Sequence, residues 1–276
     1  MEKDKYLMVS EGTRALARVS QHIGLVDKVL SAREEAFLMP KTVVLVFERE
    51  DDEPLRLEVD RNIKELILSD KKIKTLPIEI GELTNLTALS LSRNEITQLP
   101  VEIGNLINLT RLNLGNNNLT QIPVEIGNLI NLTSLALRYN KLTLLPAEIG
   151  NLTNLIKLYL GSNQLTELPS EIGNLNNLTL LYLTFNELAE FPSEIGNLNN
   201  LISLNLGWNK LTHLPMEIIK LTNLTSLDLQ WNELIQLPAE IGNLVDLTSL
   251  TLTRNRLSND EKEKIKALLP KCIIEF

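Results

Sequence analysis

The chain has 276 residues, of which 43% are hydrophobic, 22% are charged and only 4% are aromatic, and its formal net charge is −8. This acidic balance lacks the basic footprint of nucleic-acid-binding proteins, so we expect no nucleic-acid partner. The only cysteine, Cys272, excludes an internal disulfide and a multi-cysteine zinc site and suits a reducing compartment, so we expect a cytoplasmic location.

The N-terminal segment, residues 1–40, contains one predicted amphipathic helix over residues 10–33, with Ser10 as a plausible cap. Its apolar residues follow one another at spacings of 3, 4, 3 and 4 along a narrow seam: Leu16, Val19, Ile23, Val26 and Leu30. Two heptads are too few to choose between a lid on the following array and a helix that docks or self-associates. No signal-peptide-like core and no run of about 18 apolar residues occurs, so we expect no membrane span.

Residues 41–61 are predicted to form a β-hairpin. The run Thr42–Glu48 is strand-like, and Leu55–Val59 alternates apolar and polar side chains after an acidic turn. We expect the first strand to be buried and the second to begin the sheet of the array that follows. Such a hairpin would cover the apolar cross-section that a repeat stack exposes at its end.

Residues 62–257 are organised by a repeat of 23 residues, exemplified by LTALSLSRNEITQLP at 86–100. Leucines alternate with polar residues in each unit, which predicts a short strand with one buried face. A Pro-x-Glu-Ile-Gly segment follows, in which proline suits the first position of a short helix and glycine suits its end. Strands lie closer together than helical segments, so the stack should curve with its parallel strands on the concave side.

One asparagine in each unit is expected to bond the backbone of neighbouring turns inside the bend. These residues form a predicted asparagine ladder: Asn94, Asn117, Asn140, Asn163, Asn186, Asn209, Asn232 and Asn255. The first unit, which carries Lys71 instead, is degenerate, and eight full units follow it.

The LxxLxLxxNxL pattern and the LPxEIGNL return resemble the leucine-rich repeat proteins, in the 23-residue subclass of Ras-associated scaffolds, Roco proteins and many bacterial proteins. The resemblance covers about residues 62–258. It implies an α/β solenoid: a horseshoe with a parallel concave β-sheet and short helical convex returns. It also implies a scaffold for protein binding in signalling. The chain departs from the pattern at Ile219, where the other returns carry glycine.

Residues 258–276 break the spacing and are predicted to form a C-terminal cap. Ser258 begins a helix that Pro270 stops, and Cys272–Phe276 forms a last strand. We interpret Cys272 as a core residue, because no histidine lies near it in the sequence to activate a nucleophile.

No catalytic or cofactor motif is present: the phosphate-binding, dinucleotide, metalloprotease and nucleophile-elbow patterns do not occur. We therefore expect no catalytic, metal or cofactor site and no enzyme activity.

Aromatic and basic residues gather on the predicted concave face. The position just before the ladder asparagine, here called the turn column, consists of Asp70, Arg93, Asn116, Tyr139, Ser162, Phe185, Trp208, Trp231 and Arg254. Exposed aromatics could simply stack along the sheet, but contiguous ones usually mark a binding patch. The predicted partner-binding residues are Arg111, Arg138, Tyr139, Lys157, Tyr159, Tyr182, Phe185, Trp208 and Trp231.

Nine basic residues outnumber six acidic ones in these concave positions, which predicts a partner with acidic and apolar surface. The basic set is Lys72, Arg93, Arg111, Arg138, Lys141, Lys157, Lys210, Arg254 and Arg256, and the acidic set is Glu65, Asp70, Glu95, Glu187, Asp228 and Glu233.

The sequence thus predicts a non-enzymatic module for protein–protein interaction that binds a protein on its concave face. The alternative is a regulatory or effector component of a larger assembly, docked through the N-terminal helix.

Overall fold

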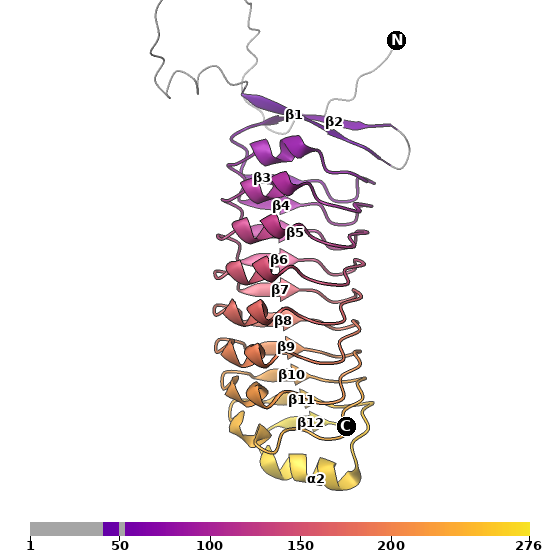
Figure 1. Ribbon diagram of the computed structural model, residues 1–276, viewed down its shortest axis with the longest axis vertical. Helices are drawn as coiled ribbons and strands as arrows, with labels where there is room; N and C mark the ends of the chain where they lie inside the picture. Colours follow the sequence, from indigo (N-terminus) through magenta and orange to yellow (C-terminus); the bar gives the residue numbers. More distant parts are fainter. Residues whose placement is uncertain (1–40, 50–52) are drawn as a thin grey trace, which may run out of the picture.

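The computed structural model describes residues 41–49 and 53–276, and the helix predicted within residues 10–33 lies outside them. The described residues form one stack of repeat units, in which the short helical returns lie in front of the strands of a parallel sheet in the view of Figure 1. The sheet runs in the order β12-β11-β10-β9-β8-β7-β6-β5-β4-β3. The predicted solenoid is confirmed.

Each repeat contributes one three-residue strand, and equivalent residues of neighbouring strands pair directly, as Leu135 pairs with Leu158. Because no strand slips in register, every unit sits on the last in the same pose. The strands are β3 (Glu65–Ile67), β4 (Ala88–Ser90), β5 (Arg111–Asn113), β6 (Ser134–Ala136), β7 (Lys157–Tyr159), β8 (Leu180–Tyr182), β9 (Ser203–Asn205), β10 (Ser226–Asp228), β11 (Ser249–Thr251) and β12 (Ile273–Glu275).

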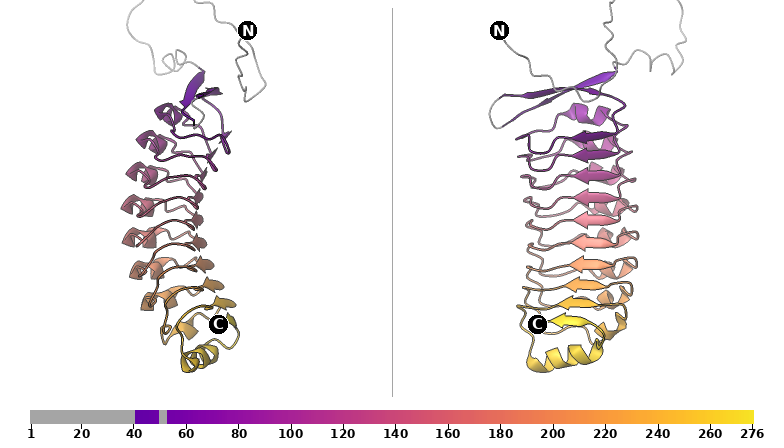
Figure 2. Two further views of the ribbon diagram at one scale, coloured as in Figure 1. Left: turned by 90° about the vertical axis from the view of Figure 1, so that its right-hand side faces the viewer. Right: turned by 180° about the vertical axis from the view of Figure 1, so that it is seen from behind.

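The returns are 3₁₀ turns, and in the first seven a proline with extended backbone stands immediately before the first helical residue. The sequence-based expectation of proline at the first helical position was therefore off by one residue. The returns are η1 (Ile78–Glu82), η2 (Val101–Asn105), η3 (Val124–Asn128), η4 (Ala147–Asn151), η5 (Ser170–Asn174), η6 (Ser193–Asn197), η7 (Met216–Lys220) and η8 (Ile241–Asn243). Figure 2 shows the returns on the convex side and the strands on the concave side.

A continuous core of leucine and isoleucine lies between the sheet and the returns. The middle residue of each repeat strand is buried, as are the isoleucine of each return and the leucine that follows the return. Burial of apolar area on this scale, at roughly 25 cal/mol per Å², is the main stabilising term. Since each unit buries its faces only against its neighbours, stability is distributed along the stack.

Close packing between units explains why glycine recurs in the returns, and a helix end does not. A Cβ placed on Gly150 would lie 2.5 Å from the backbone oxygen of Glu171 and 2.7 Å from its Cβ. Gly81, Gly104 and Gly173 face the next return in the same way. The sequence-based explanation of these glycines as helix terminators was wrong, because they lie within the 3₁₀ turns.

Ile219 occupies this glycine position in η7, and the following return differs from the others. Glu240, which by its spacing would face Ile219, lies outside the helical turn with φ −90° and ψ 15°. The turn η8 keeps only three residues, beginning at Ile241. We attribute the shortened turn to the isoleucine side chain, which takes the space that glycine leaves elsewhere.

The N-terminal hairpin is present, but two expected details are wrong. Strands β1 (Thr42–Phe47) and β2 (Leu55–Asp60) form a separate two-stranded antiparallel sheet, and the repeat sheet begins only at β3. The first strand is buried on one face alone, with Val44 and Val46 exposed. The hairpin turns its other face to the core, because it covers the end of the stack.

The C-terminal cap is confirmed as a helix followed by a strand. Helix α2 (Asn259–Leu268) begins after Ser258, whose Oγ accepts a hydrogen bond from the backbone N–H of Glu261 at 3.1 Å. Strand β12 then pairs with β11 in parallel and completes the sheet. Ile265 and Leu269 are buried against the last repeat. Among the described residues, no helix is long and apolar enough to span a bilayer.

Candidate functional site

The turn column stands at the end of each strand, where the backbone adopts a left-handed conformation. Its nine residues have φ between 52° and 61°. Left-handed backbone disfavours residues with a Cβ by roughly 1–2 kcal/mol, and bulky side chains there are genuine outliers. Tyr139, Phe185, Trp208 and Trp231 therefore occupy positions for which glycine or asparagine is locally preferred.

This conformation gives a stability prediction at Ser162, which has φ 56° and, although it lies between Tyr139 and Phe185 in the column, has no ring of its own to stack on them. Ser162→Gly should raise the free energy of unfolding by about 0.5–1 kcal/mol, because relief of backbone strain exceeds the added unfolded-state entropy. Urea denaturation measures the change. The control Ser170→Gly, at the start of η5, should destabilise; an equal effect at both positions would contradict the strain argument.

Three aromatic residues of the turn column form a continuous exposed stack. The ring centroids of Phe185 and Trp208 lie 4.9 Å apart and those of Trp208 and Trp231 lie 4.1 Å apart, with nearly parallel planes. The guanidinium of Arg254 closes the stack 5.1 Å from the Trp231 centroid. The rings remain 49%, 37% and 40% exposed in chain order, so the stack presents its outer edges to solvent. We call Phe185, Trp208, Trp231 and Arg254 the aromatic stack.

Two tyrosines form a second, smaller aromatic group on the sheet itself. Tyr159 and Tyr182 end β7 and β8, and their rings meet edge to face with centroids 5.6 Å apart. Tyr139 is 55% exposed and lies two units before the aromatic stack. The predicted aromatic patch is thus divided into a stack, a tyrosine pair and an isolated tyrosine.

Four of the concave basic residues are held by acidic neighbours one or two units away. Arg111 pairs with Glu65 at 2.8 Å, Lys210 with Glu187 at 2.9 Å and Arg256 with Glu233 at 3.0 Å, while Arg93 lies 3.8 Å from Asp70. Arg138, Lys141 and Lys157 form no ion pair within the described part of the chain. Lys72 and Arg254 also have no ion pair among the described residues, so the unpaired positive charge lies in units four and five and at one residue near each end of the face.

A hollow of about 480 Å³ opens on the concave face next to these cations. Residues from β3 to β7 line it, among them the small side chains of Ala88, Ser90, Ser134 and Ala136 and the long polar ones of Glu65, Arg111, Arg138 and Tyr159.

The asparagine ladder lies behind the turn column. Asn163, only 8% exposed, donates from Nδ2 to the carbonyls of Leu137 and Leu160 at 3.0 and 2.9 Å, and its Oδ1 accepts from the Leu142 N–H at 3.1 Å. Asn94 through Asn232 repeat this pattern and are buried, while Asn255 makes the same bonds half-buried at the cap. The ladder holds the turns that carry the concave surface, and its side chains are not available to a ligand.

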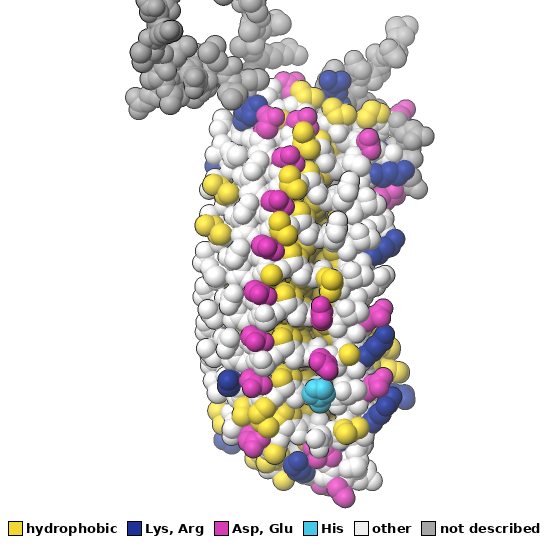
Figure 3. Space-filling model, viewed as in Figure 1, with side chains coloured by type: hydrophobic (Ala, Val, Ile, Leu, Met, Phe, Trp, Pro, Cys, Tyr) yellow, Lys and Arg dark blue, Asp and Glu magenta, His cyan; other side chains and the backbone are white. Residues whose placement is uncertain are grey.

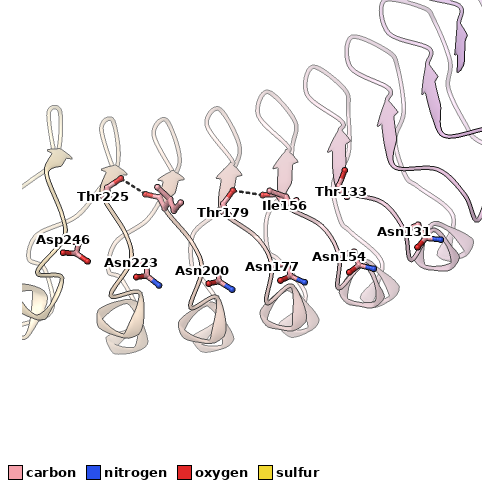
Figure 4. Close-up of a pocket in the computed structure, with 11 residues that line it drawn as sticks. Asn131, Thr133, Asn154, Ile156, Asn177, Thr179, Asn200, Asn223, Thr225 and Asp246 are labelled. Carbon is pink, nitrogen blue, oxygen red and sulfur yellow. Dashed lines mark hydrogen bonds between the residues drawn. The ribbon is translucent and has the colours of Figure 1, made fainter.

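A second asparagine column, which the sequence analysis did not identify, lines the flank of the stack. Asn131, Asn154 and Asn177 each donate from Nδ2 to a backbone carbonyl 24 residues earlier, at 2.8–2.9 Å. With threonine and isoleucine side chains they border a shallow groove of about 1060 Å³ that ends at Asp246 (Figure 4). The recurrence of these asparagines every 23 residues in the sequence could have identified the column. The groove is wide and open, and its amide donors are already bonded, so it is the weaker candidate site.

The convex face carries acidic side chains in the first turn of each of the first seven returns. Figure 3 shows a column of acidic side chains beside a column of apolar ones on this face. Much of the net negative charge therefore lies opposite the concave cations.

No group of three or more histidine, cysteine or acidic residues is arranged to hold a metal ion in the described ranges. Burial raises the pKa of the Cys272 thiol, which disfavours the thiolate that nucleophilic chemistry requires.

Comparisons with known families match most of the stack. A model described as "Leucine-rich repeat region" matches residues 101–185 and 172–269, and one described as "Leucine rich repeat" matches residues 61–119. No curated protein sequence matches the chain.

Solved structures also resemble the chain. A leucine-rich repeat protein of Leptospira interrogans is 35% identical over 78% of this chain and 73% of its own, with a TM-score of 0.43. The ectodomain of the Arabidopsis thaliana receptor kinase GASSHO1/SCHENGEN3, in complex with Casparian strip integrity factor 2, is 31% identical over 71% of this chain and 27% of its own, with a TM-score of 0.60. The Arabidopsis receptor kinase HAESA, in complex with a peptide hormone and a co-receptor, is 29% identical over 71% of this chain and 39% of its own, with a TM-score of 0.58. The chain spans less than half of either plant receptor.

Proposed function

Because the chain belongs to the leucine-rich repeat family, we propose that it is a non-enzymatic protein-binding module whose partner lies on the concave face. Its 23-residue spacing and LPxEIGNL returns favour the subclass of intracellular scaffolds and bacterial proteins. The GASSHO1/SCHENGEN3 ectodomain is in complex with Casparian strip integrity factor 2, and HAESA is in complex with a peptide hormone and a co-receptor. Their ligands support a polypeptide as the class of partner.

The observation that carries the proposal is the aromatic stack. Three bulky rings occupy left-handed positions that disfavour them and still leave their edges exposed. Stacking accounts for part of their stability, but it does not require tryptophan at a strained surface turn. Exposed tryptophan and tyrosine dominate binding hot spots, because they bury a large area with little loss of conformational entropy. We therefore assign the aromatic stack as the apolar anchor for the partner.

The cations in the two units before the stack set the expected character of the partner. Arg138, Lys141 and Lys157 are exposed, and no acidic side chain pairs with them among the residues described. A partner with acidic and apolar surface would pair with these cations and cover the rings. Such cations raise the association rate and fix orientation.

Replacing both tryptophans tests the assignment. Trp208→Ala with Trp231→Ala should weaken partner binding by about 2 kcal/mol, because the central rings of the stack are lost. A partner captured from native lysate by the wild type and identified by mass spectrometry would be titrated against both proteins by calorimetry. A loss below about 1 kcal/mol would place the hot spot elsewhere.

The matched control is Val101→Ala with Val124→Ala, which removes exposed apolar side chains from the convex returns. This control should bind the partner like the wild type. Deletion of residues 1–40 should also leave binding intact; loss of binding on deletion would favour a component docked through the N-terminal segment.

A further inference from the structure

The concave face carries two different subsites at a fixed separation. The hollow beside Arg138 is lined by residues from β3 to β7, and the aromatic stack begins at the turn after β8. Arg138 itself stands immediately before the turn column in unit four. The two subsites therefore belong to adjacent columns of the same surface.

The hollow is suited to an anionic side chain. Its floor consists of small residues such as Ser90 and Ala136, which leave room for an incoming group. Arg138 rises at its rim, and Lys157 lies on the adjacent strand β7. Neither Arg138 nor Lys157 has an ion-pair partner in residues 41–49 or 53–276, so a ligand carboxylate would meet available positive charge. The one carboxylate in the lining, that of Glu65, is already bound to Arg111 at 2.8 Å.

A path of small side chains connects the hollow to the aromatic stack. In the column that contains Arg138, the next three units place Gly161, Thr184 and Gly207, which are buried or half-buried. Each of the three comes two residues after the last residue of its strand and immediately before the turn-column residue of its unit. A ligand backbone can run along this path with the rings at its side.

The separation of the subsites sets the spacing of ligand groups. Trp208 lies three strands beyond Arg138, and strands are about 4.8 Å apart, so the distance along the stack is about 14 Å. An extended polypeptide advances about 3.3 Å per residue, so about four residues span this distance.

We propose that the concave face binds an extended peptide segment of the partner in which an acidic side chain and a bulky apolar side chain stand about four residues apart. The acidic side chain enters the hollow at Arg138 and Lys157, and the apolar one packs on Trp208. The inference rests on the proposed function and adds the chemistry and spacing of the ligand.

Synthetic peptides test the spacing directly. Capped Gly/Ser peptides would carry one Phe and one Glu separated by one, four or eight positions. Trp208 and Trp231 are the only tryptophans in the chain, so intrinsic fluorescence reports binding at the stack itself. The four-residue peptide should bind roughly tenfold more tightly than the other two, because it alone satisfies both subsites.

Protein variants assign this preference to the hollow. Arg138→Glu with Lys157→Glu should remove the tenfold advantage and leave the weaker binding of a peptide containing Phe alone. The matched charge control, Lys220→Glu with Lys271→Glu, lies on the η7 return and after the C-terminal helix and should keep the advantage. Glu65→Gln should tighten binding of the four-residue peptide, because it releases Arg111 and removes a competing carboxylate.

The possible outcomes separate this inference from the proposed function. Equal binding of the three peptides with a fluorescence change would overturn the acidic subsite and leave the concave anchor in place. Absence of any fluorescence change with every peptide would count against both the inference and the aromatic anchor. A preference for four residues that survives Arg138→Glu with Lys157→Glu would also overturn the assignment of the hollow.

Discussion

Asn163→Ala is expected to lower the free energy of unfolding by about 3 kcal/mol, because three buried backbone groups lose their partners at once. The carbonyls of Leu137 and Leu160 and the N–H of Leu142 all bond this one side chain. No neighbouring strand can replace these bonds, since the chain bends away from the sheet at this point. Urea denaturation followed by circular dichroism measures the loss.

The matched control is Gln164→Ala, which removes an exposed amide from the next residue. It should change stability by less than about 0.5 kcal/mol, as surface substitutions usually do. If Asn163→Ala proved as mild as this control, water would have to satisfy the buried groups, and the ladder would lose its structural importance.

Gly150→Ile should destabilise the fold by about 3 kcal/mol, because its Cβ would overlap the backbone of the next return. The nearest atom is the Glu171 oxygen at 2.5 Å, and a backbone oxygen held in a 3₁₀ turn cannot move aside as a flexible side chain can. We expect the η5 turn to shorten in this variant as η8 does beside Ile219. Thermal and urea unfolding measure the loss, and a crystal structure tests the local change.

Gly115→Ile is the control, since it adds the same side chain to a glycine on the concave side. There the nearest atoms are the Arg138 Cγ and Asn113 Oδ1, both at 3.3 Å, and the arginine side chain can shift. A smaller loss is expected than at Gly150. A larger loss at Gly115 would refute close packing between returns as the reason for their glycine.

The repeat architecture could be predicted because its signals are local and periodic. Leucine alternation specifies the strands, and the ladder asparagine specifies the bend, at one fixed spacing throughout. The role of the return glycine was not predictable in this way, since it depends on atoms 21 residues further along the chain. The hairpin was misassigned because alternation in Leu55–Val59 identifies a strand without identifying its sheet.

The candidate site was predicted as a set of residues but not as an arrangement. The 23-residue spacing assigned Phe185, Trp208 and Trp231 to one column, and the structure shows them stacked there. The left-handed backbone beneath them could not be anticipated, because bulky residues rarely adopt it. The ion pair between Arg111 and Glu65 could not be anticipated either, because the two residues are two units apart. This pair occupies Arg111, whereas Arg138 and Lys157 keep no acidic partner among the described residues.

The junction after η7 has a consequence for how the array unfolds. Each unit packs its core only against its neighbours, so cooperativity is transmitted mainly through the junctions one after another. At Ile219 the close packing of return on return is interrupted, and the coupling between the two sides is weaker there than elsewhere. The last two units and the C-terminal cap therefore form the segment most prone to sub-global opening, in which Trp231 leaves the stack while Trp208 stays folded with the N-terminal part.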